Sequence, residues 1–391
     1  MKYKLKDIFD LQMGKTPSRN NTEYWNTEEH KWISIADLTK TGKYISETKE
    51  CLSNRAIDDS GIKVIPANTV VMSFKLSIGK TAITAEDMYS NEAIMAFHDR
   101  HVVEILPEYI YYMFKYKNWD EGSNKAVMGK TLNKATLSEV EIDICSLEEQ
   151  REIVKVLDKM MTVLDGRETE LLLLDDLIKA RFVEMFGSIY DGKFDMKTLP
   201  EIVSDNKNSI KRGPFGGALK KDDFVEDGYL VYEQRHAIHN DFEYEKYYIT
   251  QEKYKDMIGF KVVPGDLIIS CSGVTLGRIA EVPKGAKEGI INQALLKISL
   301  DSDVMLNTFF IQQFRGEEIQ EILFGFSRGS GIPNMPSMRE VKAVKFICPP
   351  LELQKQYCDF VNQVNKSKVA VQKALDEMQK LFDSLMQQYF G

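Results

Sequence analysis

Apolar residues recur at alternating steps of four and three in two long windows, residues 147–187 and 351–391. This heptad spacing predicts two long helices that pair through one apolar seam. Charged residues interrupt the seam only at Arg167, Arg181 and Lys368. The predicted seam residues are Ile153, Leu157, Met160, Leu164, Leu171, Leu174 and Ile178 in the first window, and Tyr357, Val361, Val364, Leu375, Met378 and Phe382 in the second.

The two windows are also copies of one another, because they align without a gap at an offset of 204 residues. Two unrelated amphipathic helices would not be expected to keep a constant offset over this length, so an internal repeat is the better interpretation. The identical pairs are Leu147/Leu351, Glu148/Glu352, Gln150/Gln354, Leu171/Leu375, Leu177/Leu381, Phe186/Phe390 and Gly187/Gly391.

The segments that precede the two helices repeat as well, with offsets that drift. Residues 63–73 match residues 261–270 at an offset of 198, and residues 91–94 match 292–295 at 201. Asn133 matches Asn334, also at 201. Such drift is expected where loops of duplicated domains gain or lose residues.

Each segment mixes strand and helix signals. Short β-branched runs at 69–72 and 267–270, bounded by Pro and Gly, predict strands, and the apolar faces of 107–114 and 306–314 predict helices. We therefore expect an α/β (α+β) fold with an internal pseudo-twofold repeat, whose strand order the sequence leaves open. The expected parts are two domains at 1–145 and 188–347, each followed by a long helix, at 146–187 and 348–391, and the helices pair as an antiparallel coiled coil.

Length and composition fit this organisation. At 391 residues and 43% hydrophobic, the chain is long enough for two domains with separate cores. No apolar run approaches the roughly 20 residues that span a bilayer, and the N-terminus lacks a signal-peptide pattern. We therefore expect a cytoplasmic protein that has no membrane partner. Five cysteines without a CxxC pair argue against a disulfide framework and a zinc site.

Motifs for catalysis or cofactor binding are missing from the sequence. Gly14, Gly79 and Gly129 each begin Gly-Lys-Thr, but the glycine that a phosphate-binding loop needs five residues upstream is missing in all three cases. His236 and His239 have no third ligand nearby, which favours a polar loop over a metal site. We therefore expect no catalytic residue, no metal and no cofactor bound by this chain.

Several loops combine glycine with basic and hydroxyl residues, although the net charge is −8. Glycine lets a backbone approach DNA closely, Lys and Arg contact phosphates, and polar side chains pair with base edges, so local basic clusters matter more than net charge. Asn292 and Gln293 could read bases or simply end a strand. The candidate DNA-binding residues are Lys15, Thr16, Ser18, Arg19, Lys75, Ser77, Lys80, Lys125, Lys130, Lys134, Lys211, Arg212, Phe215, Lys220, Arg235, Ser272, Thr275, Arg278, Arg328, Ser330 and Asn334.

With these motifs together, the chain resembles the DNA-specificity subunits of type I restriction-modification systems over nearly its whole length. Such subunits carry two target-recognition domains, each followed by a helix that opens with Pro-Pro-Leu-x-x-Gln. That signature is present at 349–354, whereas the first helix opens with Ser146-Leu147 and departs from it at the prolines. The loops at 14–18, 213–217 and 329–334 are also similar to family patterns.

The resemblance implies a non-catalytic chain that binds double-stranded DNA and docks two methyltransferase subunits, joined by motor-nuclease subunits. S-adenosylmethionine and ATP are then expected in those partners. Helices of about 40 residues at 1.5 Å per residue would hold the domains roughly 60 Å apart, against about 34 Å for one DNA turn. We therefore expect a bipartite target with an unread spacer.

Other readings of the sequence stay open. A coiled-coil scaffold that binds protein partners without DNA would carry the same helices. An enzyme with an unrecognised site is disfavoured by the missing motifs. A specificity subunit whose methyltransferase has no nuclease partner would have the same sequence features.

Overall fold

The computed structural model describes residues 1–25, 27–75, 77–119, 132–325 and 333–391, and these form two compact units. Unit 1 comprises Met1–Glu168 and Lys373–Gly391, and unit 2 comprises Thr169–Gln372. This division crosses the sequence boundaries at 146–187 and 348–391, because each long helix contributes part of its length to both units.

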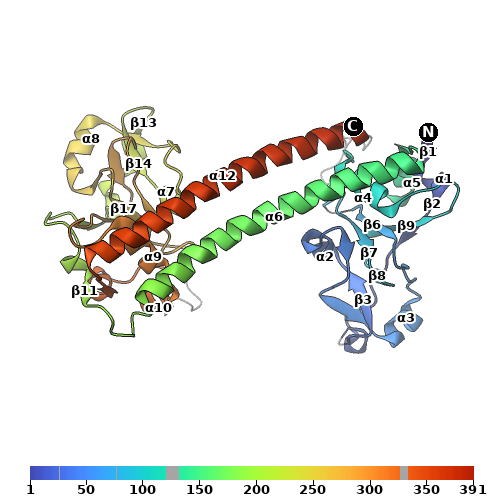
Figure 1. Cartoon of the computed structure of the whole chain (residues 1–391), viewed down its shortest axis with the longest axis horizontal. Helices are drawn as coiled ribbons and strands as arrows, with labels where there is room; N and C mark the ends of the chain where they lie inside the picture. The colour runs from blue at the N-terminus through green and yellow to red at the C-terminus, as the bar shows by residue number, and fades with distance from the viewer. Residues whose placement is uncertain (26, 76, 120–131, 326–332) are drawn as a thin grey trace. The chain divides into compact units, whose positions relative to one another are not determined.

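The two long helices are α6 (Leu147–Phe186) and α12 (Leu351–Phe390), each 40 residues long (Figure 1). In unit 2 the hydroxyl of Tyr357 donates to the carbonyl of Ile178 at 3.4 Å. In unit 1 Leu157 and Met386 belong to one core. The end of one helix therefore packs on the start of the other within each unit, which confirms the predicted antiparallel pairing.

The predicted seam follows the buried side of this pair. Each of its thirteen residues is buried or half-buried. Two of the charged residues that interrupt the seam form ion pairs: Lys368 contacts Asp175 at 2.5 Å, and Arg181 contacts Glu184 at 2.7 Å. Long basic side chains are thus accommodated at the seam margin with their charged ends paired.

Unit 1 contains a five-stranded sheet in the order β2-β9-β6-β7-β4, a three-stranded sheet β5-β3-β8 and the pair β1-β10. Its strands are β1 (Lys2–Lys4), β2 (Phe9–Met13), β3 (His30–Ile33), β4 (Tyr44–Ile45), β5 (Glu50–Leu52), β6 (Val70–Ser73), β7 (Thr81–Thr84), β8 (Tyr89–Ser90), β9 (Ile94–Asp99) and β10 (Glu141–Asp143). Its shorter helices are α1 (Leu5–Ile8), α2 (Ile35–Lys40), α3 (Asn54–Ser60), α4 (Pro107–Tyr116) and α5 (Lys134–Ser138).

Unit 2 contains a four-stranded sheet in the order β12-β20-β17-β18, a five-stranded sheet β13-β15-β14-β19-β16 and the pair β11-β21. Its strands are β11 (Met196–Thr198), β12 (Ile210–Arg212), β13 (Phe224–Val225), β14 (Tyr229–Tyr232), β15 (Tyr248–Ile249), β16 (Lys261–Val262), β17 (Leu267–Ser270), β18 (Ile279–Glu281), β19 (Gly289–Ile291), β20 (Leu295–Ile298) and β21 (Lys345–Ile347). Its shorter helices are α7 (Gln234–His239), α8 (Gln251–Asp256), α9 (Asn307–Arg315), α10 (Glu317–Phe324) and α11 (Met338–Ala343).

The predicted α/β fold with an internal repeat is therefore confirmed. The predicted strands correspond to β6 and β17, which are buried at all four positions because both faces of each strand are covered. The predicted helices correspond to α4 and α9, which pack apolar faces into the cores of their units. Within the described ranges, no helix has the length and hydrophobicity of a membrane span.

A buried glutamine anchors the start of each long helix to the loop before α4 or α9. The Oε1 atom of Gln150 accepts the backbone N–H of Leu106 at 2.9 Å, and its Nε2 donates to two backbone carbonyls at 3.0 Å. Gln354 makes the equivalent bonds to Leu306 and to two carbonyls, at 2.9 to 3.0 Å. The identical glutamines of the repeat therefore perform one structural task twice.

Hydrogen bonding corrects two matches that the sequence suggested. Ser73 is equivalent to Ser270, at an offset of 197 rather than 198. The hydroxyl of Ser73 donates to the carbonyl of Ser77 and accepts the N–H of Lys80, and that of Ser270 makes the equivalent bonds to Thr275 and Arg278. Asn133 is equivalent to Ser337 and not to Asn334, because Asn133 and Ser337 cap α5 and α11. The two residue types satisfy the same backbone donor at a helix start, so they interchange easily.

The prediction that His236 and His239 lie in a polar loop is also wrong. Both histidines lie on α7, and His236 is fully buried. Its ring nitrogens lie 2.8 Å from the carbonyl of Tyr244 and 3.1 Å from that of Glu233. His236 therefore has a structural role in the core of unit 2.

Candidate nucleic-acid interface

In unit 2 the candidate loops meet at one edge of the sheet β12-β20-β17-β18. The N–H of Gly213, after β12, donates to the carbonyl of Leu295 at 2.8 Å. The N–H of Cys271, after β17, donates to Ala294 at 2.8 Å, and Ser272 forms a β-bridge with Asn334. Loops far apart in the sequence are thus held together by backbone bonds.

The same arrangement occurs in unit 1. The N–H of Gly14 donates to the carbonyl of Ile94 at 3.2 Å, and that of Phe74 donates to Ala93 at 2.9 Å. Gly14 and Gly213 are both required by close backbone approach: a Cβ at Gly14 would lie 2.2 Å from the carbonyl oxygen of Asn91, and one at Gly213 would lie 1.8 Å from that of Asn292. These glycines hold the loops against the strand ends.

Asn91 and Asn292 have structural roles, which is the strand-end role that the sequence offered for Asn292. Their side-chain oxygens accept the backbone N–H two residues later, at 3.0 Å in both units. The residue that follows each asparagine, Glu92 or Gln293, is exposed at the tip of the turn. Gln can pair with adenine and Glu can accept from cytosine, so this position is a candidate reader in both units. Sequence reasoning did not select Glu92, although the repeated Asn-x-Ala pattern marks it.

Carboxylates bind candidate DNA-binding residues of unit 1. Arg19 forms a two-pronged ion pair with Glu50, and its guanidinium stacks on Trp25 at 3.7 Å. Thr16 donates to Glu92, and this hydrogen bond lowers the pKa of Glu92, assisted by the charges of Lys75 and Arg19. The free positive charge of this edge is therefore smaller than the sequence suggests.

Three other unit 1 candidates are also held by the chain itself. The ammonium group of Lys15 donates a hydrogen bond to the carbonyl of Ser60. The carbonyl of Ser18 accepts from the indole of Trp25 at 3.0 Å, and that of Ser77 accepts from Ser73 at 2.6 Å. Lys80 and Lys134 have exposed side chains, the latter at the first position of α5.

Aromatic side chains accompany the cations of unit 2. Arg212 lies 5.1 Å from the ring centroid of Phe215, which is 65% exposed, and the buried Nε of Arg212 has no hydrogen-bond partner. Lys211 lies 4.7 Å from the ring of Phe260, and Arg235 lies 4.4 Å from that of Tyr244. An exposed aromatic ring beside a guanidinium suits stacking on bases.

Arg235 also contacts Asp241 at 3.5 Å, so its charge is partly opposed. Lys220 is exposed, and its backbone N–H donates to Asp223 at 2.6 Å. The predicted residues Lys125, Lys130, Arg328 and Ser330 lie outside the described residues.

The loop between β17 and β18 is tied down at several points. Ser270 donates to the carbonyl of Thr275 and accepts the N–H of Arg278 at 2.9 Å. Gln234 donates to the hydroxyl of Ser272 at 2.8 Å. This fixed loop presents Val274 with 98% of its surface exposed. Sequence reasoning missed Val274, because an apolar residue between strands is usually expected in the core.

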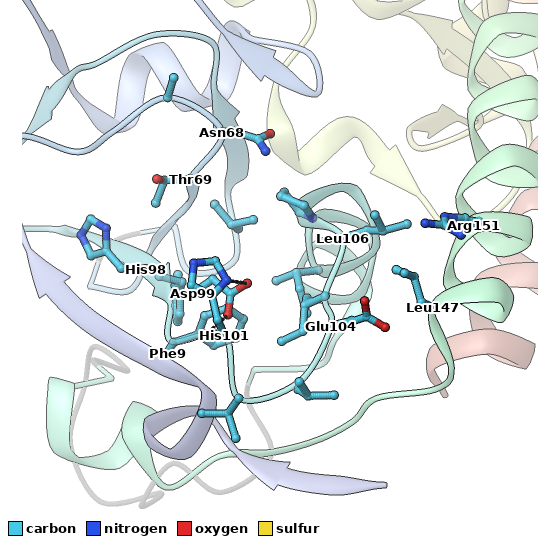
Figure 2. Close-up of a pocket in the computed structure, with 18 residues that line it drawn as sticks. Phe9, Asn68, Thr69, His98, Asp99, His101, Glu104, Leu106, Leu147 and Arg151 are labelled. Atoms are coloured by element: carbon cyan, nitrogen blue, oxygen red, sulfur yellow. Dashed lines mark hydrogen bonds and ion pairs between the residues drawn. The ribbon is translucent and has the colours of Figure 1, made fainter.

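A separate cavity of about 700 Å³ in unit 1 lies beside the start of α6. Figure 2 shows His98, Asp99 and His101 on one side and Leu147 and Arg151 of α6 on the other. His101 contacts Asp99 at 3.2 Å, and burial lowers the pKa of His98. The candidate DNA-binding residues do not line this cavity, so it is distinct from the loop edge.

The chain matches the family model described as the type I restriction modification DNA specificity domain over residues 1–172 and 214–378. It is 28% identical over 190 residues to the type I restriction enzyme MjaIX specificity subunit of Methanocaldococcus jannaschii, covering 47% of this chain and 43% of the relative. The matched region thus spans less than half of that relative's length.

Two solved structures share the fold. The S subunit of a type I restriction-modification system from M. genitalium has a TM-score of 0.54 at 16% identity, over 100% of this chain and 96% of that chain. A chain from a structure concerned with complex assembly and conformational transition of the type I R-M system has a TM-score of 0.65 at 15% identity, over 100% and 97%. At these identities the likeness concerns the fold alone.

Proposed function

The chain belongs to the type I restriction modification DNA specificity domain family, and from that premise we propose that it selects the double-stranded DNA target of a type I restriction-modification complex. Its own role is binding, and the chemistry belongs to partner subunits. The observation that carries the proposal is the gathering of equivalent glycine-containing loops at the same sheet edge in both units, through the same backbone bonds.

Each unit then reads one half of a bipartite target. The two edges carry different side chains at equivalent positions: Glu92 corresponds to Gln293, and Thr16 corresponds to Phe215. Different donors and acceptors select different bases, so the two half-sites differ in sequence. The common scaffold supports similar placement of the loops within each unit.

The long helices set the length of the unread spacer. Each is an unbroken helix of 40 residues, which corresponds to about 60 Å at 1.5 Å per residue. Removing seven residues, one heptad, from one helix keeps the seam in register. It shortens the helix by about 10 Å, which corresponds to the length of roughly three base pairs of DNA. The preferred spacer should shorten accordingly, and an unchanged spacer would exclude this role.

The repeat also supports docking of two copies of one partner, which we propose to be the methyltransferase subunits. Leu177 and Leu381 occupy the same position of the two helices and are 45% and 52% exposed. An apolar residue repeated on both surfaces suits an apolar contact with each partner copy. In this proposal the methyltransferases bring S-adenosylmethionine, motor-nuclease subunits bring ATP-dependent activity, and the complex works in the cytoplasm.

The decisive experiment expresses the chain with its cognate methyltransferase in a host that lacks adenine methylation and sequences the methylated positions. We expect one bipartite motif whose two halves flank a spacer of fixed length. Exchanging Gln293 for Glu should change the preference in one half only. Methylation without a shared motif, or with the chain omitted, would contradict the proposal.

A further inference from the structure

A cavity of about 460 Å³ in unit 2 lies beneath the loop between β17 and β18. Two arginines, Arg278 and Arg315, line it, and the exposed Val274 forms part of its rim. The remaining lining residues carry no carboxylate: Ala237, Ile238, Leu276, Gly277, Ile279 and Gln320. Two cationic side chains therefore line the cavity without a carboxylate among the other lining residues.

The two guanidinium groups influence each other directly. The Nη2 of Arg315 donates to the carbonyl of Ile279 at 2.8 Å, which fixes its position. Burial and then the charge of Arg278 lower the pKa of Arg315, against an opposing effect of Asp175. In the described part of the chain, Arg278 forms no ion pair with a carboxylate, so its charge is available to an anionic ligand in this cavity.

The loop that carries Arg278 is held at two points. The N–H of Gly273 donates to the carbonyl of Pro333 at 2.9 Å. Gly277 has a positive φ of 80°, and a Cβ there would lie 2.5 Å from the ring of Phe324 on α10. Because the loop is anchored before any ligand arrives, little ordering is needed when one binds.

The same pair of cationic positions occurs in unit 1. Lys80 corresponds to Arg278, because the backbone N–H of each donates to the hydroxyl of the equivalent serine, Ser73 at 3.1 Å and Ser270 at 2.9 Å. Lys115 corresponds to Arg315 near the end of the equivalent helix, since the loops before α4 and α9 are anchored by Gln150 and Gln354 in the same way. The recurrence of two cations supports a common task.

We propose that Arg278 and Arg315 together hold one phosphate group of the DNA backbone, with Val274 placed against the DNA at the rim. This inference rests on the proposed function. A guanidinium fork matches phosphate geometry, and two forks can donate to both non-bridging oxygens of one phosphate. DNA is favoured over a free anion because the rim loop bonds directly to the edge where Ser272 meets Asn334.

The test measures binding of the full chain to its methylation-defined target duplex by fluorescence anisotropy across a salt series. Arg278→Ala should weaken binding about tenfold or more and reduce the salt slope by about one, the value of one phosphate contact. Arg278→Lys should retain the slope. Arg339→Ala is the matched control, because Arg339 is exposed on α11 of the same unit and does not line the cavity.

Duplexes with single neutral methylphosphonates then locate the phosphate. A methylphosphonate at one position of the duplex should weaken binding of the wild-type chain but should not further weaken binding of Arg278→Ala. If Arg278→Ala behaves like Arg339→Ala, the inference is overturned. It is also overturned if inorganic phosphate alone binds at Arg278 while the DNA slope stays unchanged. Failure of the wild-type chain to select any duplex is a different outcome, which rejects the proposed function itself.

Discussion

Replacing Gln354 with methionine tests whether the repeated glutamine anchors the second unit. Methionine has a similar length and no hydrogen-bonding amide, so the change removes bonds while creating little empty space. Gln354 is fully buried, and its side chain bonds one backbone N–H and two carbonyls, those of Leu306, Val304 and Pro349. All three backbone groups lose this partner at once.

The expected cost follows from those three bonds. A buried group left without its partner costs about 1–3 kcal/mol, and the carbonyls lie at the lower end because each has a second lone pair. The sum is about 3–6 kcal/mol, which corresponds to a fall in exchange protection of about 10²-fold to 10⁴-fold. Hydrogen exchange resolved by segment is the appropriate assay, because two units need not unfold as one.

Gln150→Met supplies a matched control within the same chain. Gln354→Met should reduce protection around Leu306 and spare Leu106, whereas Gln150→Met should do the reverse. Unchanged protection at Leu306 would show that the bonds carry little energy. Equal loss around both leucines would show that the two units are not separate in stability, and either result would refute the reasoning.

Three further predictions concern partner binding and ionisation. Leu381→Glu should reduce the mass of the purified complex by one methyltransferase, and Leu177→Glu should release the other copy. Both variants should still bind DNA, and a complex of full mass would contradict this prediction. Burial raises the pKa of the Cys271 thiol to about 12, so its alkylation should be slow at pH 8 and accelerate toward pH 12, and a rate plateau near pH 9 would be inconsistent. Hydrogen bonds from Lys6 and Lys4 lower the pKa of Glu139 to about 2, so its contribution to stability is present above its ordinary pKa of 4.5 and is lost as pH falls toward 2. Glu139→Gln should remove that pH dependence from exchange of the β1-β10 pair, and an unchanged profile would assign it elsewhere.

The long helices were predictable from the sequence because a heptad pattern over 40 residues is a strong local signal. Strand order was not, because it depends on pairing between residues far apart, as when β2 after the N-terminus pairs with β9. The match of Asn133 to Asn334 failed for a chemical reason. Asparagine and serine cap helices equally well, so identity of residue type misled where equivalence of role, with Ser337, was the true relation.

The candidate site was predictable only at the level of loops. Glycine beside Lys or Arg selected the segments that meet at the sheet edges, whereas the state of each cation depends on distant residues. Arg19 lies far in sequence from Glu50, which neutralises it. Val274 escaped selection because its type suggests burial, and only the bonds that tie its loop explain its exposure.

These contrasts separate two kinds of position in a duplicated chain. Gln150 and Gln354 face backbone groups, which are chemically the same in every sequence, so duplication preserved both the residue and its bonds. Glu92 and Gln293 occupy equivalent backbone turns and are exposed at the tip, and Glu92 accepts a hydrogen bond from Thr16, whose equivalent in unit 2 is Phe215. The side chain at the tip can change without loss of the turn, because the asparagine side chains and backbone hydrogen bonds hold the turn. A fixed turn with a variable tip lets one scaffold be used twice and still present different hydrogen-bonding groups to two half-sites.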